Sequence, residues 1–343
     1  MAVVQDPASF PGGGSFPTGQ PVPSGGPSDA DRPRVLTPTF TRGDRTFRGI
    51  CTAAAAVSLV IIVSTTVFLF AKSVPAVSST GIKDFFTTSE WSPADDHYGV
   101  FGLLVGTVII AVIALVVAVP AAIGLALFIN EYAPHRARKV LVGSVDLLAA
   151  MPSLIFGMWG FFALQGPLVG VAKWLNQHLD ALPFFRLSEE GASLSRSSFI
   201  VGMVVAIMIV PIITSVSRDV MAQCPRGLCE GAFALGGSRW GMIRDVIIPF
   251  GKGGIVGSVL LGFGRALGET IAVALIIALV YEPNPFVLEE GGGSIAGLIA
   301  VKFAEADGLE ISGLIAAGFA LFLLTLVVNL AARRIVARSR VVG

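Results

Sequence analysis

The hydrophobic pattern of the chain is a series of long apolar runs separated by shorter polar segments. A run of about 20 apolar residues is long enough to cross a bilayer as a helix. Six runs reach that length, and they cover approximately residues 49–71, 100–129, 140–164, 199–216, 255–281 and 311–332. The pattern therefore predicts an all-α integral membrane protein, with six transmembrane helices inside a domain that covers residues 46–343.

The polar segment between the fourth and fifth runs has a helical pattern of its own. Apolar residues recur at three- and four-residue spacing over 218–236, and Pro225 is expected to break or start a helix within it. Two glycines follow. Ser238 is then a suitable N-cap for a short helix over 239–247, which Pro249 is expected to end. A connector that merely rests on the membrane surface would show the same pattern.

Lysine and arginine are distributed unevenly between the polar segments. They are concentrated before the first run, after the second, between the fourth and fifth, and after the sixth. The alternate segments are poorer in them and more acidic. Because the cytoplasmic segments of membrane proteins carry the excess of positive charge, both termini and the segment at about 218–252 are predicted to be cytoplasmic.

Composition supports the membrane assignment and separates the first residues from the rest. Charged residues make up 14% of the chain, against about 25% in soluble domains. Residues 1–45 are rich in Pro, Gly and Ser, so we expect a disordered cytoplasmic tail there. The net charge of +1 gives no indication of a nucleic-acid partner, and none is expected.

The chain has few candidates for metal binding or redox chemistry. Cys224 and Cys229 are five residues apart, which is not the close spacing of a zinc pair, and together with Cys51 they are interpreted as reduced packing residues. The Asp-Asp-His cluster at 95–97 is interpreted as a solvated outer loop. No metal ion or cofactor is expected.

Two charged residues, Arg265 and Glu269, interrupt the fifth run. Each costs about 2.5–3.5 kcal/mol near the centre of a membrane helix. At a spacing of four they either neutralise each other and fix helix packing, or they form a polar path in which Arg265 binds an anion and Glu269 holds Arg265 in place. Asp146 in the third run is a further candidate for this path, unless it lies near the cytoplasmic end of its run.

The fifth run also carries a stripe of small residues that is expected to let a neighbouring helix approach closely. The stripe consists of Gly253, Gly257, Gly264 and Gly268.

The polar segment between the fourth and fifth runs also carries a recognisable motif. Glu230 and Ala232 are followed at fixed spacing by Gly236 and, after nine more residues, by the sequence VIIP that ends at Pro249. This spacing resembles the EAA loop of the ABC importer permeases, with a glycine in place of the second residue of the motif. The resemblance implies a MetI-like permease fold and a coupling helix that sits in a cleft of an ATPase subunit. The residues implied for this coupling are Glu230, Ala232, Gly236, Arg239 and Pro249.

The sequence GRALGET at 264–270 is one of five stretches along the chain that resemble the same family of permeases. The others are GDRTFRG at 43–49, FFTTSEWSP at 85–93, MPSLIFGMWGFF at 151–162 and KFAEADG at 302–308. Together they resemble the PstC branch of the phosphate ABC permeases. The resemblance implies a permease subunit of an ATP-driven importer of inorganic phosphate in the bacterial cytoplasmic (inner) membrane. It also implies that Arg265 and Glu269 matter for transport.

The same resemblance implies partners on separate chains. They are a homologous PstA-type permease, two ATP-binding cassette ATPase subunits and an extracytoplasmic phosphate-binding protein, besides membrane lipid. The sequence contains no G-x-x-x-x-G-K-[ST] motif, so ATP hydrolysis is expected from a partner and this chain is expected to be a transport subunit, not an enzyme. Two alternatives are a permease for another anion or solute, and a gradient-driven secondary transporter, which would typically show an inverted repeat.

Overall fold

The computed structural model of the protein describes residues 42–189 and 191–339. The chain falls into two units, Met1–Leu59 and Val60–Gly343, and helix α1 (Arg42–Thr80) passes from the first into the second. The predicted disordered tail lies outside the described residues, apart from residues 42–45. These form the first turn of α1, which corrects the predicted boundary of the tail.

Six helical stretches of the described residues are long and apolar enough to cross a membrane, which confirms the predicted number. They are Arg42–Thr80, Phe101–Tyr132, Ser153–Leu179, Ser198–Met221, Arg239–Leu267 and Gly308–Arg334. The first, fourth and sixth contain the predicted runs and extend beyond them, and the second begins one residue later than predicted and ends at Tyr132. The third and fifth differ from the prediction, for reasons given below.

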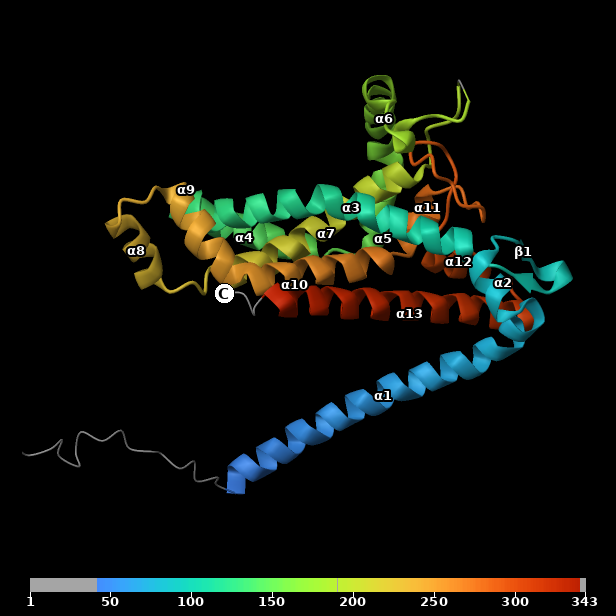
Figure 1. Cartoon of the computed structure of the whole chain (residues 1–343), viewed down its shortest axis with the longest axis horizontal. Helices are drawn as coiled ribbons and strands as arrows, with labels where there is room; N and C mark the ends of the chain where they lie inside the picture. The colour runs from blue at the N-terminus through green and yellow to red at the C-terminus, as the bar shows by residue number, and fades with distance from the viewer. Residues whose placement is uncertain (1–41, 190, 340–343) are drawn as a thin grey trace, which may run out of the picture. The chain divides into compact units, whose positions relative to one another are not determined.

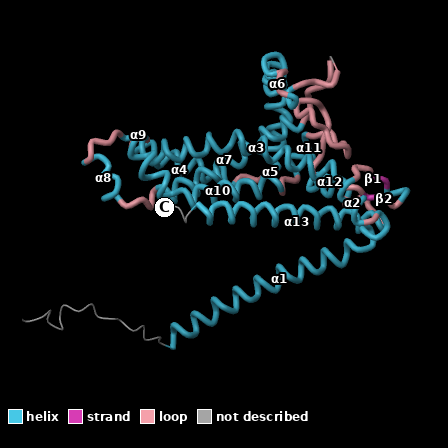
Figure 2. The backbone as a smooth tube through the Cα atoms, in the orientation of Figure 1, coloured by secondary structure: helices cyan, strands magenta, loops and turns pink. Residues whose placement is uncertain are grey.

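Helices account for most of the described chain, and its strands are limited to one short hairpin (Figure 2). After α1 come α2 (Ile82–Thr87), β1 (Trp91–Ser92), η1 (Pro93–Asp95), β2 (His97–Tyr98), α3 (Phe101–Leu127), η2 (Phe128–Tyr132), α4 (His135–Ala150), α5 (Ser153–Trp159), η3 (Gly160–Leu164) and α6 (Gln165–Leu179). Then follow η4 (Pro183–Phe185), α7 (Ser198–Met221), α8 (Arg226–Ala234), α9 (Arg239–Met242), η5 (Ile243–Ile247), α10 (Ile248–Leu267), α11 (Ile271–Ile276), α12 (Ile295–Lys302) and α13 (Gly308–Ser339).

The core of the larger unit forms around α7, which packs against α3, α10 and α4 (Figure 1). α3 carries alanines at three- and four-residue spacing, and Ala111, Ala114, Ala118 and Ala122 are all fully buried. Small side chains let membrane helices approach closely, which matters because lipid is as apolar as the helices themselves. α7 is therefore the element against which the neighbouring helices are positioned.

The two ends of the larger unit carry different elements. α8 and α9 lie at one end, called here the α8 end, and α2, the hairpin and α12 lie at the other, called the β1 end (Figure 1). In the hairpin Trp91 pairs with Tyr98. α12 begins directly after Ser294, whose Oγ caps it by accepting a hydrogen bond from the Gly297 backbone N at 3.0 Å.

α10 approaches α7 closely through residues with small side chains. A Cβ added at Gly254 would lie 2.5 Å from a valine side chain of α7, and one at Gly262 would lie 2.7 Å from an isoleucine of the same helix. Between them, the hydroxyl groups of Ser258 and Ser217 are hydrogen-bonded at 2.7 Å and buried. These contacts fix the face that α10 turns toward the core.

Three of the four glycines of the predicted stripe contact no neighbouring helix within the described residues. Gly257 and Gly264 meet open space, and Gly268 meets only carbonyl oxygens of its own helix. Glycines recur at helical spacing along α10 in two sets. The set that packs on α7 includes Gly254 and Gly262, and it is not the predicted set. Gly257, Gly264 and Gly268 leave space beside α10 within the described residues, and close approach of another helix at the stripe stays a prediction.

The third predicted run, 140–164, is wrong in its limits. α4 ends before Met151, which is extended at φ −68° and ψ 139°, and α5 begins at Ser153. Pro152 accounts for the break, because the residue before a proline disfavours the α-helical region. The candidate span is Ser153–Leu179, and its last part, α6, runs across the direction of α3 (Figure 1).

The fifth predicted run, 255–281, is wrong at both ends. The candidate span is Arg239–Leu267, so it begins inside the polar segment. After Leu267 the helix breaks at 268–270, and the short α11 that follows ends at Ile276. The charged residues of the fifth run thus lie at a helix break and not within one continuous helix.

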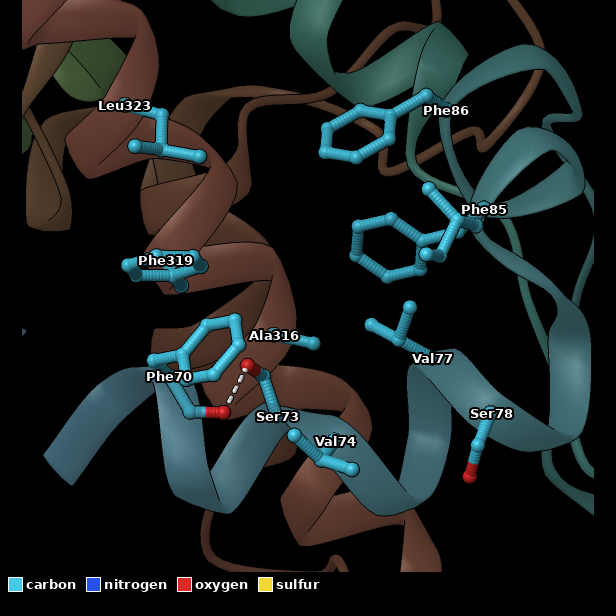
Figure 3. Close-up of a pocket in the computed structure, with 11 residues that line it drawn as sticks. Phe70, Ser73, Val74, Val77, Ser78, Phe85, Phe86, Ala316, Phe319 and Leu323 are labelled. Carbon is cyan, nitrogen blue, oxygen red and sulfur yellow. Dashed lines mark hydrogen bonds between the residues drawn. The ribbon is translucent and has the colours of Figure 1, made fainter. Parts of the chain in front are cut away.

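An apolar cavity of about 280 Å³ lies between α1, α2 and α13 at the β1 end (Figure 3). Phe70, Val77, Phe85 and Phe319 are among its lining residues. The Ser73 hydroxyl donates to the carbonyl oxygen of Phe70 at 2.8 Å, so its hydrogen bond is satisfied within the helix. The lining residues include no charged side chain, so this cavity is not a site for a polar solute.

Candidate functional site

The break between α10 and α11 places Arg265 on an exposed face. Arg265 is in the last turn of α10 and its side chain is exposed. The same face carries Leu261, which is 55% exposed, as well as Gly257 and Gly268. The adjoining face, with Gly262, packs against α7. Within the described part of the chain, the surface around Arg265 is therefore open to a solute or a partner.

Glu269 points into the protein and holds the helix that follows. It is only 6% exposed, and its Oε1 accepts a hydrogen bond from the backbone N of Ala272 at 3.1 Å. This bond satisfies one of the N–H groups that the start of α11 leaves without a helical partner. α11 packs closely on α5, where a Cβ at Gly157 would lie 2.9 Å from the Ala272 Cα. Glu269 thus fixes the course of the chain directly after Arg265.

Arg265 and Glu269 do not form the pair that their spacing suggested. Neither an ion pair nor a hydrogen bond joins their side chains among the residues that the structure describes. The spacing argument assumes a continuous helix, and the break at 268–270 removes that assumption. The interpretation that the two charges only neutralise each other does not fit this geometry, while their part in a path stays a prediction.

Asp146 lies beside Arg218 and not beside Arg265. Its Oδ1 is 3.7 Å from the Nη2 of Arg218 and accepts a hydrogen bond from the Ser215 hydroxyl at 3.0 Å. Arg218 also donates to Oδ1 of Asp219, at 3.0 Å from Nε and 2.9 Å from Nη2. The Asp146 side chain is 49% exposed and that of Arg218 only 10%.

Sequence reasoning missed Arg218, because a basic residue at the edge of an apolar run is read as a cytoplasmic flank. Its carbonyl oxygen accepts a hydrogen bond from Asn130 Nδ2 at 2.8 Å, and Arg138 donates to Asn130 Oδ1 at 3.0 Å. Its Nη1 is buried and has no hydrogen-bond partner among the described residues. The set Asn130, Arg138, Asp146, Ser215 and Arg218, called here the Arg218 cluster, joins η2 and α4 to the end of α7.

The Asp146–Arg218 pair is expected to contribute about 1 kcal/mol or less to the free energy of unfolding, because water screens the half-exposed Asp146. Arg218→Ala should destabilise the protein more than Asp146→Asn, since Arg218 also bonds to Asp219 and Ser215. Thermal unfolding of the two single variants and the double variant in detergent measures the coupling between the two residues.

Asp245→Asn is the matched control for that cycle. Asp245 pairs with Arg244 at 3.9 Å, with both side chains about three-quarters exposed at 74% and 75%, so its loss should leave the unfolding temperature unchanged. A double variant of Asp146 and Arg218 destabilised by the full sum of its single variants would show that the pair contributes nothing.

The segment predicted to couple to an ATPase forms a helix, a turn and a second helix at the α8 end. Pro225 is the N-cap residue of α8, so a helix starts at that proline, one of the two expected outcomes. α8 closes at Gly236, which has a φ of +83°. Gly237 N donates to Ala232 O at 3.0 Å and Gly236 N donates to Phe233 O at 2.9 Å. This is the Schellman pattern, and it favours glycine at the left-handed position.

The second helix of this segment runs directly into the fifth span. Ser238 Oγ accepts a hydrogen bond from Gly241 N at 3.1 Å, which confirms it as the N-cap of α9. The prediction that Pro249 ends the helix is wrong. The π-turn η5 precedes it, with Ile248 N donating to Ile243 O, and such a wider turn accommodates the ring and the missing N–H of proline. α9, η5 and α10 form one continuous helix of 29 residues.

The predicted coupling residues of α8 are divided between two faces. Ala232 packs inward with Cys229, against a buried cluster that includes Met242. Glu230 and Gly236 are exposed. Large apolar side chains are also exposed on α8 and its C-cap, and such patches mark contact surfaces. They are Leu228, Phe233 and Leu235, which are 53%, 46% and 91% exposed.

Arg239 contacts its own chain. Its Nη1 donates to the carbonyl oxygen of Glu131 at 3.1 Å, and its guanidinium carbon lies 5.4 Å from the centroid of the Tyr132 ring. That distance suits a cation–π interaction. Arg239 therefore links α9 to η2, at the end of the span that contains α3.

The Asp-Asp-His cluster at 95–97 forms a tight turn. Asp95 lies in η1 and its Oδ2 accepts a hydrogen bond from the Ser92 hydroxyl at 2.7 Å. The described residues contain no group of three or more His, Cys, Asp and Glu side chains arranged to hold a metal ion.

These features define the class of protein. Six bilayer-length helices, an arginine on the open face of one of them and an exposed apolar connector at one end are the parts of a multi-pass membrane permease. Both the open face of α10 and the patch on α8 are exposed within the described residues.

Comparison with known proteins identifies the family. Residues 118–341 match the family of binding-protein-dependent transport system inner membrane components. The phosphate transport system permease protein PstC 2 of Mycobacterium tuberculosis is 39% identical over 298 residues, which cover 86% of this chain and 92% of that protein. The PstC protein of Haemophilus influenzae is 40% identical over 259 residues, which cover 75% and 81%. The chain therefore belongs to the binding-protein-dependent transport permeases, and within them to the PstC family.

The fold agrees with that of a solved importer. A chain from a bacterial ABC transporter involved in the import of the acidic polysaccharide alginate has a TM-score of 0.52 and 19% sequence identity, and the match covers 86% of this chain and 99% of that one. The six-helix importer-permease fold expected from the sequence is confirmed.

Proposed function

We propose that this chain is a permease subunit of an ATP-driven importer of inorganic phosphate. The observation that carries the proposal is the exposed Arg265 at the break in the fifth span, in a chain whose relatives are named phosphate transport permeases. A guanidinium group donates paired hydrogen bonds to phosphate oxygens in a planar fork. An arginine in a membrane span is costly without such a task.

The open face of α10 forms one wall of the phosphate path, and a homologous PstA-type permease supplies the opposite wall. Gly257 and Gly268 leave space around Arg265 for a solute or for the partner's helices. Glu269 acts through the cap on α11, which fixes the chain beside Arg265. Asp146 acts at a distance from Arg265, by holding α4 against the end of α7 through the Arg218 cluster.

Two ATP-binding cassette ATPase subunits drive the cycle through α8 and the equivalent helix of the partner permease. The exposed apolar residues of α8 seat in the ATPase surface. The continuous helix from Arg239 through α10 then carries a rigid-body push to Arg265, roughly 40 Å along its axis. The bond of Arg239 to Glu131 passes the same displacement to the span of α3.

In this arrangement the α8 end faces the cytoplasm of a bacterium and the β1 end faces outward from the inner membrane. The concentration of Lys and Arg in the segments around the α8 end supports this orientation, which places both termini in the cytoplasm. An extracytoplasmic binding protein delivers phosphate to the β1 end.

Reconstitution of this chain with its PstA-type partner and the ATPase subunits in lipid vesicles tests the proposal. Phosphate-loaded binding protein is expected to raise ATP turnover and to drive labelled phosphate across the membrane. Unloaded binding protein, and sulfate in place of phosphate, are the controls, and sulfate also tests the alternative of another tetrahedral anion. Transport by this chain alone, without nucleotide and driven by a proton or sodium gradient, would contradict the proposal.

A further inference from the structure

Two cysteines meet at the junction between α7 and α8. Cys224 lies in the turn after α7 and Cys229 lies in α8. The Cys229 thiol donates to the Cys224 sulfur at an Sγ–Sγ distance of 3.9 Å. Both are free thiols and both are half-buried, whereas the remaining cysteine, Cys51, is exposed on α1.

Both cysteines pack against the same buried apolar cluster, which includes Met221, Met242 and Ile243. The two thiols therefore sit between the end of α7 and the start of the continuous helix that leads to Arg265. A disulfide needs an Sγ–Sγ distance of about 2.05 Å, so side-chain rotation and a small backbone adjustment must shorten the present contact by about 1.9 Å.

We propose that Cys224 and Cys229 form a reversible thiol–disulfide modification site whose co-reactant is a low-molecular-weight disulfide. One cysteine thiolate attacks the small disulfide, which forms a mixed disulfide and releases one small thiol. The second cysteine then attacks the protein sulfur and releases the other small thiol. Two protein thiols are oxidised, one small disulfide is reduced to two thiols, and excess thiol reverses both steps.

The consequence of this modification rests on the proposed function. The disulfide closes the loop between the end of α7 and the first turns of α8, so α8 can no longer shift relative to α7. Because α8 is the helix that receives the push of the ATPase, the oxidised chain is locked in one arrangement of its connector. In the orientation proposed above the site faces the cytoplasm, whose thiol pool keeps it reduced until that pool becomes oxidised.

The surroundings of Cys224 are expected to slow the reaction near neutral pH. Burial raises the pKa of the Cys224 thiol, and the contact with the Cys229 thiol and the negative charge of the nearby Glu131 add to the effect. Only the thiolate attacks a disulfide, so the rate of oxidation is expected to increase as the pH is raised.

Mass spectrometry of the full-length chain, after incubation with oxidised glutathione in detergent, tests the chemistry. The wild type is expected to lose the mass of two hydrogen atoms, and labelling after unfolding should find one free thiol in place of three. Cys51→Ser should form the same internal disulfide. Cys224→Ser and Cys229→Ser can carry only a mixed disulfide with glutathione. Retention of all three thiols by the wild type, or a disulfide that includes Cys51, overturns the proposal.

ATP turnover of the reconstituted complex tests the consequence. Oxidised glutathione should abolish the phosphate-stimulated part of the turnover, and excess reduced thiol should restore it. Cys51→Ser should respond as the wild type does, whereas Cys224→Ser and Cys229→Ser should not respond. If the internal disulfide forms and stimulation persists, the lock is wrong. If the reduced complex shows no phosphate stimulation, the proposed function fails, and mass spectrometry still decides the modification site.

Discussion

Replacement of Arg265 by alanine is expected to reduce phosphate uptake by about tenfold to a hundredfold, since hydrogen bonds to a charged group contribute about 1.5–3 kcal/mol. The side chain is exposed on the open face of α10, so its removal leaves no cavity and no unpaired partner within the described residues. The variant should therefore fold and assemble normally. Uptake of labelled phosphate by cells or by vesicles that contain the assembled complex is the measurement.

Two further variants distinguish the effect of losing the guanidinium group from the effect of shortening any side chain on this face. Arg265→Lys keeps the charge but loses the planar fork, and its uptake should fall between those of the wild type and the alanine variant. Leu261→Ala removes a side chain that is 55% exposed one turn earlier on the same face, and should leave uptake close to normal. Normal uptake by Arg265→Ala would remove this residue from the path.

Variants of Glu269 should behave differently, because its buried side chain accepts a hydrogen bond from the first turn of α11. Glu269→Gln keeps an oxygen that can accept the hydrogen bond from Ala272 N, so α11 should stay in place. Glu269→Ala loses that bond, which costs about 0.5–2 kcal/mol at a helix start. If Glu269 acts through α11, uptake should suffer far more from the alanine than from the glutamine.

The number of membrane spans could be predicted from the sequence, because a run of about 20 apolar residues has few stable environments other than a membrane helix. The limits of the third and fifth spans could not. A count of apolar residues does not detect the helix break at Pro152, because the residues on both sides of it are apolar. The count also does not detect the π-turn before Pro249, which lets the helix continue through a proline.

Some residues of the candidate site could likewise be predicted from the sequence, and others could not. Arg265 and Glu269 could be found because charges inside an apolar run are costly and so require an explanation. Their opposite orientations could not be found, because they depend on the break at 268–270. Arg218 carried no such signal, and its pairing with Asp146 joins residues 72 positions apart on two helices. The contact between Cys224 and Cys229 likewise depends on the turn at Pro225.

Replacement of Leu228 by aspartate is expected to weaken the retention of the ATPase by about tenfold or more, because burying a leucine contributes about 1.5–3 kcal/mol. Leu228 lies in the first turn of α8 and is 53% exposed. A carboxylate is favourable in the first turn of a helix, so the variant should keep α8 folded while it disrupts the apolar patch. Co-purification of the ATPase with the affinity-tagged permease measures the effect.

The position of the charge distinguishes docking from a general electrostatic effect. Gln223→Asp adds the same charge in the exposed turn just before α8 but leaves its apolar residues intact, so the ATPase should be retained. Leu235→Asp alters the most exposed apolar residue of the patch, at 91%, and should release the ATPase as Leu228→Asp does. Equal loss in all three variants would point to charge repulsion and not to the patch. Retention in all three would show that the ATPase contacts another surface. The proposed route from α8 through the continuous helix to Arg265 would then lose its starting point.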